Sequence, residues 1–202
     1  MLRKFVAIVL VVGLAGGAIA LGRWWANRPG LGEMGGTASA AAAADDDTAV
    51  AATPAPEFPK KAAWVQGGPL KLADLRGRVV VLHFWTNGCI NCIHNYPVYR
   101  AWQDKYAGKD LTIIGVHTPE FAWEAPAKRV RARAKANGLR FPVVLDDKAR
   151  VWKAWGNRYW PTVYLIDRQG RVRHRWEGEL HLDTAAGQRF AADIDELLAE
   201  RP

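Results

Sequence analysis

The hydrophobic positions of this chain fall into short runs, separated by stretches in which they recur at helical spacing. Residues 78–85 (RVVVLHFW) are β-branched or apolar at almost every position, which is typical of a strand covered on both faces of a sheet. Further strands are predicted at residues 111–116, 141–145, 162–167 and 172–176. Helices are predicted at residues 93–106, 119–137, 147–155 and 183–200. Strands that alternate with helices and end in a hairpin predict a mixed α/β sandwich.

The first 26 residues have the pattern of an export signal, with two basic residues before an apolar run at residues 5–21. This run of 17 residues is at the lower limit for crossing a bilayer. Trp24 and Trp25 follow it and suit the membrane interface. We expect residues 1–26 to form one uncleaved transmembrane helix, with a cleaved signal as the alternative. Either segment predicts a periplasmic domain, and the uncleaved helix predicts a single-pass protein of the cytoplasmic membrane.

Residues 27–57 show no periodicity and contain glycines, an alanine run and three consecutive aspartates. Such a segment cannot bury enough apolar surface to offset the entropy of ordering it, which predicts a flexible linker. The globular domain is expected at residues 58–202. Half of the 202 residues are hydrophobic, including ten tryptophans, and this is ample material for one core.

The formal net charge of +8 says little by itself about partners. A basic balance can indicate nucleic acid, anionic lipid or an acidic partner. No aromatic-plus-basic motif accompanies it, and the export segment argues against contact with a genome, so nucleic-acid binding is not expected. One run of basic residues is expected to form a solvated helix face, with attraction to anionic lipid headgroups as the alternative. These residues are Lys128, Arg129, Arg131, Arg133 and Lys135.

The only two cysteines, Cys89 and Cys92, form a C-x-x-C motif at the predicted junction of a strand and a helix. A disulfide that closes so short a loop stabilises a fold very little, so the pair needs a chemical explanation. The N-terminus of a helix stabilises a thiolate on the first cysteine. The second cysteine lies one turn further on, where it can attack a mixed disulfide. We therefore predict that Cys89 is the nucleophile and Cys92 the resolving thiol, without a metal or organic cofactor.

Other uses of two cysteines fit the sequence less well. Attachment of a c-type haem requires a histidine after the second cysteine, where Ile93 stands. Structural zinc requires four ligands, and no second cysteine pair exists. Copper binding by two thiolates and His94 or His174 stays open, because soft thiolates select Cu(I). Peroxidase chemistry also stays open: Thr86 precedes Cys89 in a T-x-x-C pattern, although Leu82 occupies the position of the expected proline.

Three stretches occur in an order that resembles a thioredoxin-fold domain: GGPLKLADLRGRVVVLHFWTNGCINCIHNYPVYRAW, then LTIIGVHTPEF, then WPTVYLID. The domain is most similar to exported thiol:disulfide interchange proteins of the TlpA and DipZ kind, over residues 58–198. The resemblance implies a three-layer sandwich with a central mixed sheet. It also implies a cis peptide bond before Pro161, which faces the dithiol and leaves the preceding backbone, at Trp160, free to pair with a substrate strand. An ordinary trans proline at the start of a strand is the alternative.

His83 departs from the family pattern, which has an acidic residue at this position beneath the second cysteine. A buried neutral imidazole could accept the proton of Cys92, whereas a charged one would favour the thiolate. A core histidine satisfied by one hydrogen bond is the alternative. Trp85 and Trp160 are expected to border the dithiol and to offer an apolar surface to a partner, with plain core packing as an equal alternative for Trp85.

Two further residues, His117 and Glu120, match the family's G-V-H-T-P-E-F stretch, and for them we expect only helix capping and a favourable charge at a helix start. The resemblance implies dithiol–disulfide exchange with disulfide-containing exported proteins. The direction of exchange does not follow from the sequence, because redox poise depends on the relative stability of the thiolate in the two states. The family analogy implies a reductase that receives electrons from a membrane donor, in a role such as cytochrome maturation.

Overall fold

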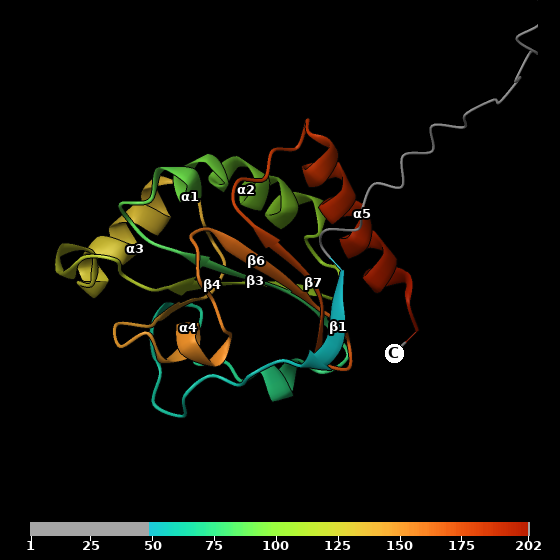
Figure 1. Cartoon of the computed structure of the whole chain (residues 1–202), viewed down its shortest axis with the longest axis horizontal. Helices are drawn as coiled ribbons and strands as arrows, with labels where there is room; N and C mark the ends of the chain where they lie inside the picture. Colours follow the sequence, from blue (N-terminus) through green and yellow to red (C-terminus); the bar gives the residue numbers. More distant parts are fainter. Residues whose placement is uncertain (1–48, 202) are drawn as a thin grey trace, which may run out of the picture. The chain divides into compact units, whose positions relative to one another are not determined.

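The computed structural model of the chain describes residues 49–201, in which a mixed sheet lies between two layers of helices and loops (Figure 1). Its strands are β1 (Ala49–Pro54), β2 (Ala63–Gln66), β3 (Val79–Trp85), β4 (Leu111–His117), β5 (Val143–Leu145), β6 (Thr162–Ile166) and β7 (Arg171–Glu177). The helices are α1 (Ile90–His94), α2 (Tyr96–Lys105), α3 (Ala127–Ala136), α4 (Arg150–Ala154) and α5 (Ala185–Ala199), with short 3-10 turns at Leu72–Leu75 and Ala122–Glu124.

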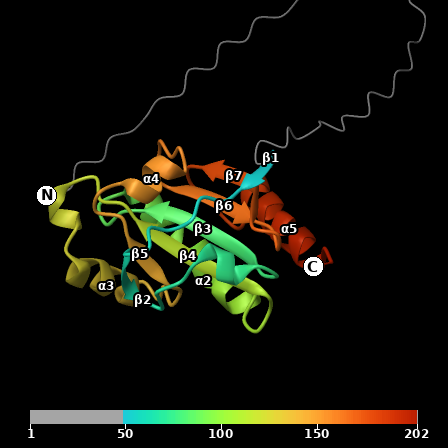
Figure 2. The same cartoon turned by 90° about the horizontal axis from the view of Figure 1, so that it is seen from below.

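The sheet has the strand order β1-β7-β6-β3-β4-β5-β2. Strand β3 pairs in parallel with β4 and antiparallel with β6, so the sheet is mixed as predicted. In Figure 2 the strands β4, β5 and β2 follow one another beside α3. The central position of β3 places its C-terminal end beside the ends of two strands that lie far from it in the sequence.

Strand β3 is buried along its whole length, and its side chains divide between two cores. Val79, Val81 and Trp85 point to the core beneath α2, α3 and α5. Val80, Leu82 and Phe84 point to the opposite core, which α4 and the first 3-10 turn cover. Because successive side chains of a strand point to opposite faces, this continuous apolar run can fill both cores at once. The predicted three-layer arrangement is confirmed.

The helix predicted at residues 93–106 is divided in two at Asn95. Pro97 has no backbone N–H to donate to the preceding turn, so the helix is interrupted there. The side chain of Asn95 fills the break: its Oδ1 accepts from the N–H of Leu180 at 2.7 Å, and its Nδ2 donates to the carbonyl of Gly178 at 3.3 Å. The motif helix α1 is therefore fixed to the loop that follows β7.

The helix predicted at residues 119–137 begins later, at Ala127, so the predicted start is wrong. Thr118, which precedes the predicted start and is a residue type common at N-caps, donates its hydroxyl to Asp146 at 3.1 Å instead. Pro126 stands at the N-cap instead, which is consistent with the poor fit of proline inside a helix. The residues between β4 and α3 form an irregular loop with one 3-10 turn.

The flexible linker predicted at residues 27–57 is wrong for its last part. Residues 49–54 form β1, which pairs antiparallel with β7 at an edge of the sheet. All six of its side chains are exposed, so its order comes from backbone hydrogen bonds, which leave no hydrophobic pattern. The predicted anchor at residues 1–26 and the linker up to residue 48 lie outside the described residues. Within residues 49–201, no helix has the length and apolar character to span a membrane.

Candidate functional site: a dithiol at the end of the central strand

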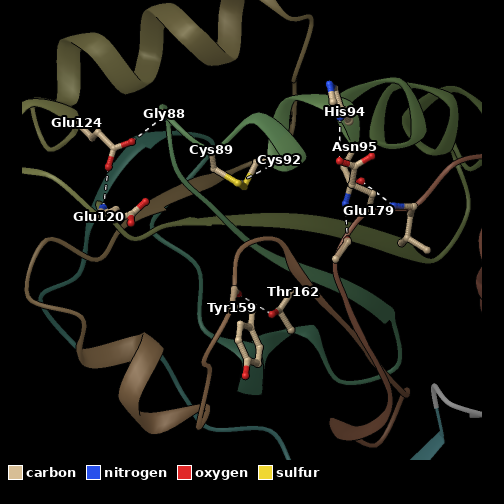
Figure 3. Close-up of a disulfide and its surroundings, with 12 residues drawn as sticks. Gly88, Cys89, Cys92, His94, Asn95, Glu120, Glu124, Tyr159, Thr162 and Glu179 are labelled. Atoms are coloured by element: carbon tan, nitrogen blue, oxygen red, sulfur yellow. Dashed lines mark hydrogen bonds and ion pairs between the residues drawn. A yellow bond between two sulfur atoms is a disulfide. The ribbon is translucent and has the colours of Figure 1, made fainter.

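The two cysteines predicted as the redox pair are joined in a disulfide at the start of α1 (Figure 3). Cys89 is the N-cap of this helix, and its Sγ accepts a hydrogen bond from the N–H of Cys92 at 3.1 Å. The two residues differ in access: Cys89 is half-buried, whereas Cys92 is only 1% exposed. An incoming sulfur atom can therefore reach Cys89 and not Cys92, in agreement with the predicted order of nucleophile and resolving thiol.

The loop before Cys89 is held by a buried carboxylate, that of Glu124. Its Oε1 accepts from the N–H of Gly88 at 2.5 Å, and its Oε2 accepts from the N–H groups of Glu120 at 2.7 Å and Phe121 at 2.9 Å. Burial favours the neutral form of this carboxyl, but the backbone donors outweigh it and lower the pKa of Glu124. A charged group is thus bonded to the residue that precedes Cys89, and Figure 3 shows it reaching across to Gly88.

Sequence reasoning singled out Glu120 in this stretch and missed Glu124. The side chain of Glu120 is exposed, and only its backbone N–H takes part in the site. Glu124 is fully buried although it belongs to an irregular loop, where no periodic pattern marks a buried position. The nearby Pro126 was the one available signal, because it argued against a continuous helix from residue 119.

The peptide bond between Trp160 and Pro161 is cis, as the resemblance implied. Phe84 of β3 pairs with Thr162 of β6, so Pro161 lies just beyond the paired part, beside the end of β3 from which the dithiol loop departs. Figure 3 shows the segment from Tyr159 to Thr162 across from the disulfide. No hydrogen bond to the backbone of Trp160 is found within residues 49–201.

His83 is fully buried on the face of β3 that carries Trp85. Its ring stacks on Tyr99 with centroids 4.1 Å apart and meets the edge of Phe141 at 4.9 Å. Neither ring nitrogen has a hydrogen-bond partner in the described part of the chain, so the alternative of a core histidine satisfied by one hydrogen bond is wrong. Burial lowers the pKa of His83 to about 3, and the imidazole is therefore neutral at pH 7. In this disulfide form, burial therefore disfavours a charged His83.

A second buried histidine, His117, lies at the end of β4, where it pairs in the sheet with Trp85. Its ring meets that of Trp85 at 5.0 Å, with the two planes nearly perpendicular. Burial lowers the pKa of His117 to about 4, although the carboxylate of Glu124 acts in the opposite direction. His117 caps no helix, contrary to the expectation from the sequence.

The two tryptophans expected to meet a partner have different surroundings. Trp85 is fully buried against Tyr96 and His117, so its predicted contact with a partner is wrong and its alternative, core packing, is confirmed. Trp160 is half-buried and packs against Trp152, with centroids 4.1 Å apart and the ring planes tilted by 32°. Contact of Trp160 with a substrate stays a prediction.

The residues invoked for copper binding and for peroxidase chemistry have the following surroundings. His94 is bonded to Glu179 at 2.9 Å, and the Nδ1 of His174 lies 3.4 Å from Asp193. Within residues 49–201, no group of three or more histidine, cysteine, aspartate or glutamate side chains could hold a metal ion. Thr86 is fully buried, and no arginine in the same range donates a hydrogen bond to the Sγ of Cys89.

Comparison with known proteins relates this site to redox proteins. Residues 51–175 match the model of the AhpC/TSA family. The chain is 40% identical over 128 residues to protein DipZ of Mycobacterium tuberculosis, an alignment that covers 62% of this chain and 18% of DipZ. It is 32% identical over 109 residues to the thiol-disulfide oxidoreductase ResA of Geobacillus thermodenitrificans. This alignment covers 54% of this chain and 60% of ResA. The chain therefore spans less than a fifth of the length of DipZ.

Solved structures agree with the fold. A crystal structure from Chlorobium tepidum, assigned as a thiol:disulfide interchange protein DsbE, is 27% identical with a TM-score of 0.63, over 73% of this chain and 97% of that one. A crystal structure of a thioredoxin-like superfamily protein is 26% identical with a TM-score of 0.65, over 74% of this chain and 99% of that one. The described residues therefore have a thioredoxin-like α/β fold with a mixed sheet.

The two buried histidines make the stability of the domain depend on pH. Their folded-state pKa values of about 3 and about 4 lie below the unfolded value of 6.5, so as the pH falls below 6.5 the unfolded chain binds protons that the folded chain does not. Each histidine should then remove about 1.4 kcal/mol of unfolding free energy per pH unit, down to its folded pKa.

This dependence can be measured by urea unfolding between pH 7 and pH 4, in the parent and in the variants His83→Leu and His117→Leu. Each variant should lose less stability over this range than the parent, by about 1.4 kcal/mol per pH unit. Equal slopes in all three proteins would contradict the assignment of these histidines as neutral groups in the folded state.

Proposed function

Because the chain belongs to the AhpC/TSA family and presents a dithiol at the start of a helix, we propose that it is a thiol–disulfide oxidoreductase acting through Cys89 and Cys92. The unequal access of the two sulfur atoms is the observation that carries the proposal. A purely structural disulfide needs no such asymmetry, whereas disulfide exchange needs one sulfur that meets the substrate and one that is kept away from it.

In the reducing direction, the thiolate of Cys89 attacks one sulfur of a substrate disulfide. This forms a mixed disulfide and releases the other substrate sulfur as a thiolate, which takes a proton from solvent. Cys92 then loses its proton and attacks the Sγ of Cys89, which releases the second substrate thiol and closes the disulfide between the two cysteines. Two electrons pass to the substrate, and a dithiol donor must return them to the protein.

The substrates we propose are exported proteins with disulfide bonds, and the donor is a membrane protein. The proposal rests on the export pattern of residues 1–26 and on the similarity to DipZ and ResA. The substrate strand would lie along the segment of Trp160 and Pro161, whose backbone groups at Trp160 make no hydrogen bond within residues 49–201. We propose that the protein is anchored in the cytoplasmic membrane with this domain in the periplasm.

We propose that the protein works as a reductase, because a carboxylate lies beside the nucleophile. The charge of Glu124 is one residue from Cys89 and repels a thiolate there, which destabilises the reduced form relative to the disulfide. A less stable reduced form has a lower reduction potential. Within residues 49–201, the Sγ of Cys89 accepts one hydrogen bond, from the N–H of Cys92.

Replacement of the cysteines tests the order of events. Cys89→Ser should abolish reduction of a disulfide substrate such as insulin, because the sulfur atom that attacks is lost. Cys92→Ser should accumulate a mixed disulfide with the substrate, detectable by mass spectrometry, because the resolving step is blocked. A Cys89→Ser protein that still reduces disulfides would falsify the proposal.

Replacement of Glu124 tests the direction of exchange. Glu124→Gln removes the charge and keeps one carbonyl oxygen, so the reduction potential should rise by about 30 mV or more, which corresponds to a tenfold change in the exchange equilibrium. The pKa of the Cys89 thiol should fall in the same variant. Glu120→Gln is the matched control, because it removes a charge from the exposed surface of the same loop. An unchanged potential in Glu124→Gln would exclude the carboxylate as the cause.

We propose that the neutral imidazole of His83 accepts the proton of Cys92, and replacement of His83 tests this step. His83→Ala should slow resolution of the mixed disulfide more than its formation, since only resolution requires deprotonation of Cys92. Stopped-flow single turnovers resolve the two steps, and His117→Ala is a control with a buried histidine on the next strand. Equal slowing of both steps would remove His83 from the mechanism.

A further inference from the structure

We propose that Phe121 and Trp123 form an aromatic wall beside Cys89, which binds an apolar side chain near the reacting cysteine of an extended substrate segment. The aromatic wall consists of these two side chains alone. The inference rests on the proposed thiol–disulfide exchange and names the class of substrate that the site prefers.

The wall is exposed although both residues are large and apolar. Phe121 is 53% exposed and Trp123 is 49% exposed, and Trp123 is the only exposed tryptophan of residues 49–201. Ile90, which follows the nucleophile, is 59% exposed. Exposed apolar groups gathered in one place are typical of a surface that another molecule covers.

The wall lies directly against the loop of the nucleophile. A Cβ atom added to Gly88 would be 3.0 Å from Cζ2 of Trp123 and 2.7 Å from Oε1 of Glu124. Gly88 precedes Cys89, so the indole lies beside the backbone that leads to the reacting sulfur. A larger residue at this position would have to displace the Oε1 of Glu124 and would also press against the indole.

The wall is also held in place before a substrate arrives. The carboxylate of Glu124 accepts the N–H of Phe121 and ties the same loop to Gly88. The two rings are nearly parallel, with centroids 6.5 Å apart and planes 7° apart. The guanidinium of Arg129 lies 5.4 Å from the centroid of the Trp123 ring. A surface fixed in this way loses little conformational entropy when it is covered.

The reaction determines what covers the wall. A mixed disulfide requires the substrate sulfur to approach within about 2.05 Å of the Sγ of Cys89. The residues that flank the substrate cysteine must then lie over the loop of Gly88 and beside Trp123. In an extended segment, residues two positions apart point to the same side and are about 6.7 Å apart. An apolar side chain two positions from the substrate cysteine is therefore the group that the wall would bind.

The test uses two synthetic peptide disulfides, each a symmetric dimer of a short peptide with one cysteine. One peptide has leucine two positions from the cysteine on both sides, and the other has serine there. The reduced full-length protein should react with the leucine peptide about tenfold faster, since one apolar side chain in a pocket typically discriminates by this much or more. The small compound bis(2-hydroxyethyl) disulfide has no flanking residues, so its rate of reduction measures the exchange reaction alone.

Phe121→Ala and Trp123→Ala should each lower the rate with the leucine peptide towards that with the serine peptide, and leave the rate with the small disulfide unchanged. Trp123→Phe should keep most of the preference, because it keeps an aromatic face. Val50→Ala removes an exposed apolar side chain from the edge strand β1 and should change none of the rates.

Equal rates with the two peptides in the parent protein, or a preference that survives in both alanine variants, would overturn the aromatic wall while the exchange activity stands. Absence of any reaction with the small disulfide, the peptides and insulin would instead overturn the proposed function. Circular dichroism of each variant separates loss of the wall from loss of the fold.

Discussion

The burial of β3 on both faces is the constraint on which the rest of the site depends. Its apolar side chains fill two cores, so the strand can neither shift nor rotate without exposing one of them. The point at which the chain leaves the sheet, just before Cys89, is therefore fixed. The neighbours of β3 are β4 and β6, and their ends bring His117 and Pro161 to the same place. Residues far apart in the sequence thus meet around one disulfide.

A single carboxylate connects the parts that this strand brings together. Glu124 holds the N–H of Gly88 with one oxygen and the loop of Phe121 with the other. Its charge also acts on His117. It raises the pKa of that imidazole, but burial lowers this pKa by more, so the pKa stays below its usual value. Three backbone donors keep the carboxylate charged in a place where water is excluded. The position of the loop before Cys89, the charge near that loop and the aromatic wall beside it therefore depend on the same side chain.

The sequence was sufficient to predict an element or a site where its pattern is local or repeated. The consecutive apolar residues of β3 predicted a central strand, and the spacing of Cys89 and Cys92 predicted their pairing. Prediction from the sequence failed for segments that are held by backbone hydrogen bonds or by contacts with residues far away in the chain. Strand β1 has only exposed side chains, and its pairing with β7 was not visible. Glu124 lies in an irregular loop, and its burial follows from the position of Gly88, which is 36 residues away.

The proposed direction of exchange rests on the charges near Cys89. A disulfide is strongly oxidising when its reduced form is stabilised, as it is when a cation or several donors face the thiolate. Within residues 49–201, the Sγ of Cys89 accepts a hydrogen bond only from the N–H of Cys92, and the buried His83 is neutral at pH 7. The charged carboxylate of Glu124 is bonded to the N–H of Gly88, the residue before Cys89. This negative charge opposes the stabilisation that the start of α1 gives to a thiolate at Cys89, and it is the observation that supports the proposed transfer of electrons to a substrate.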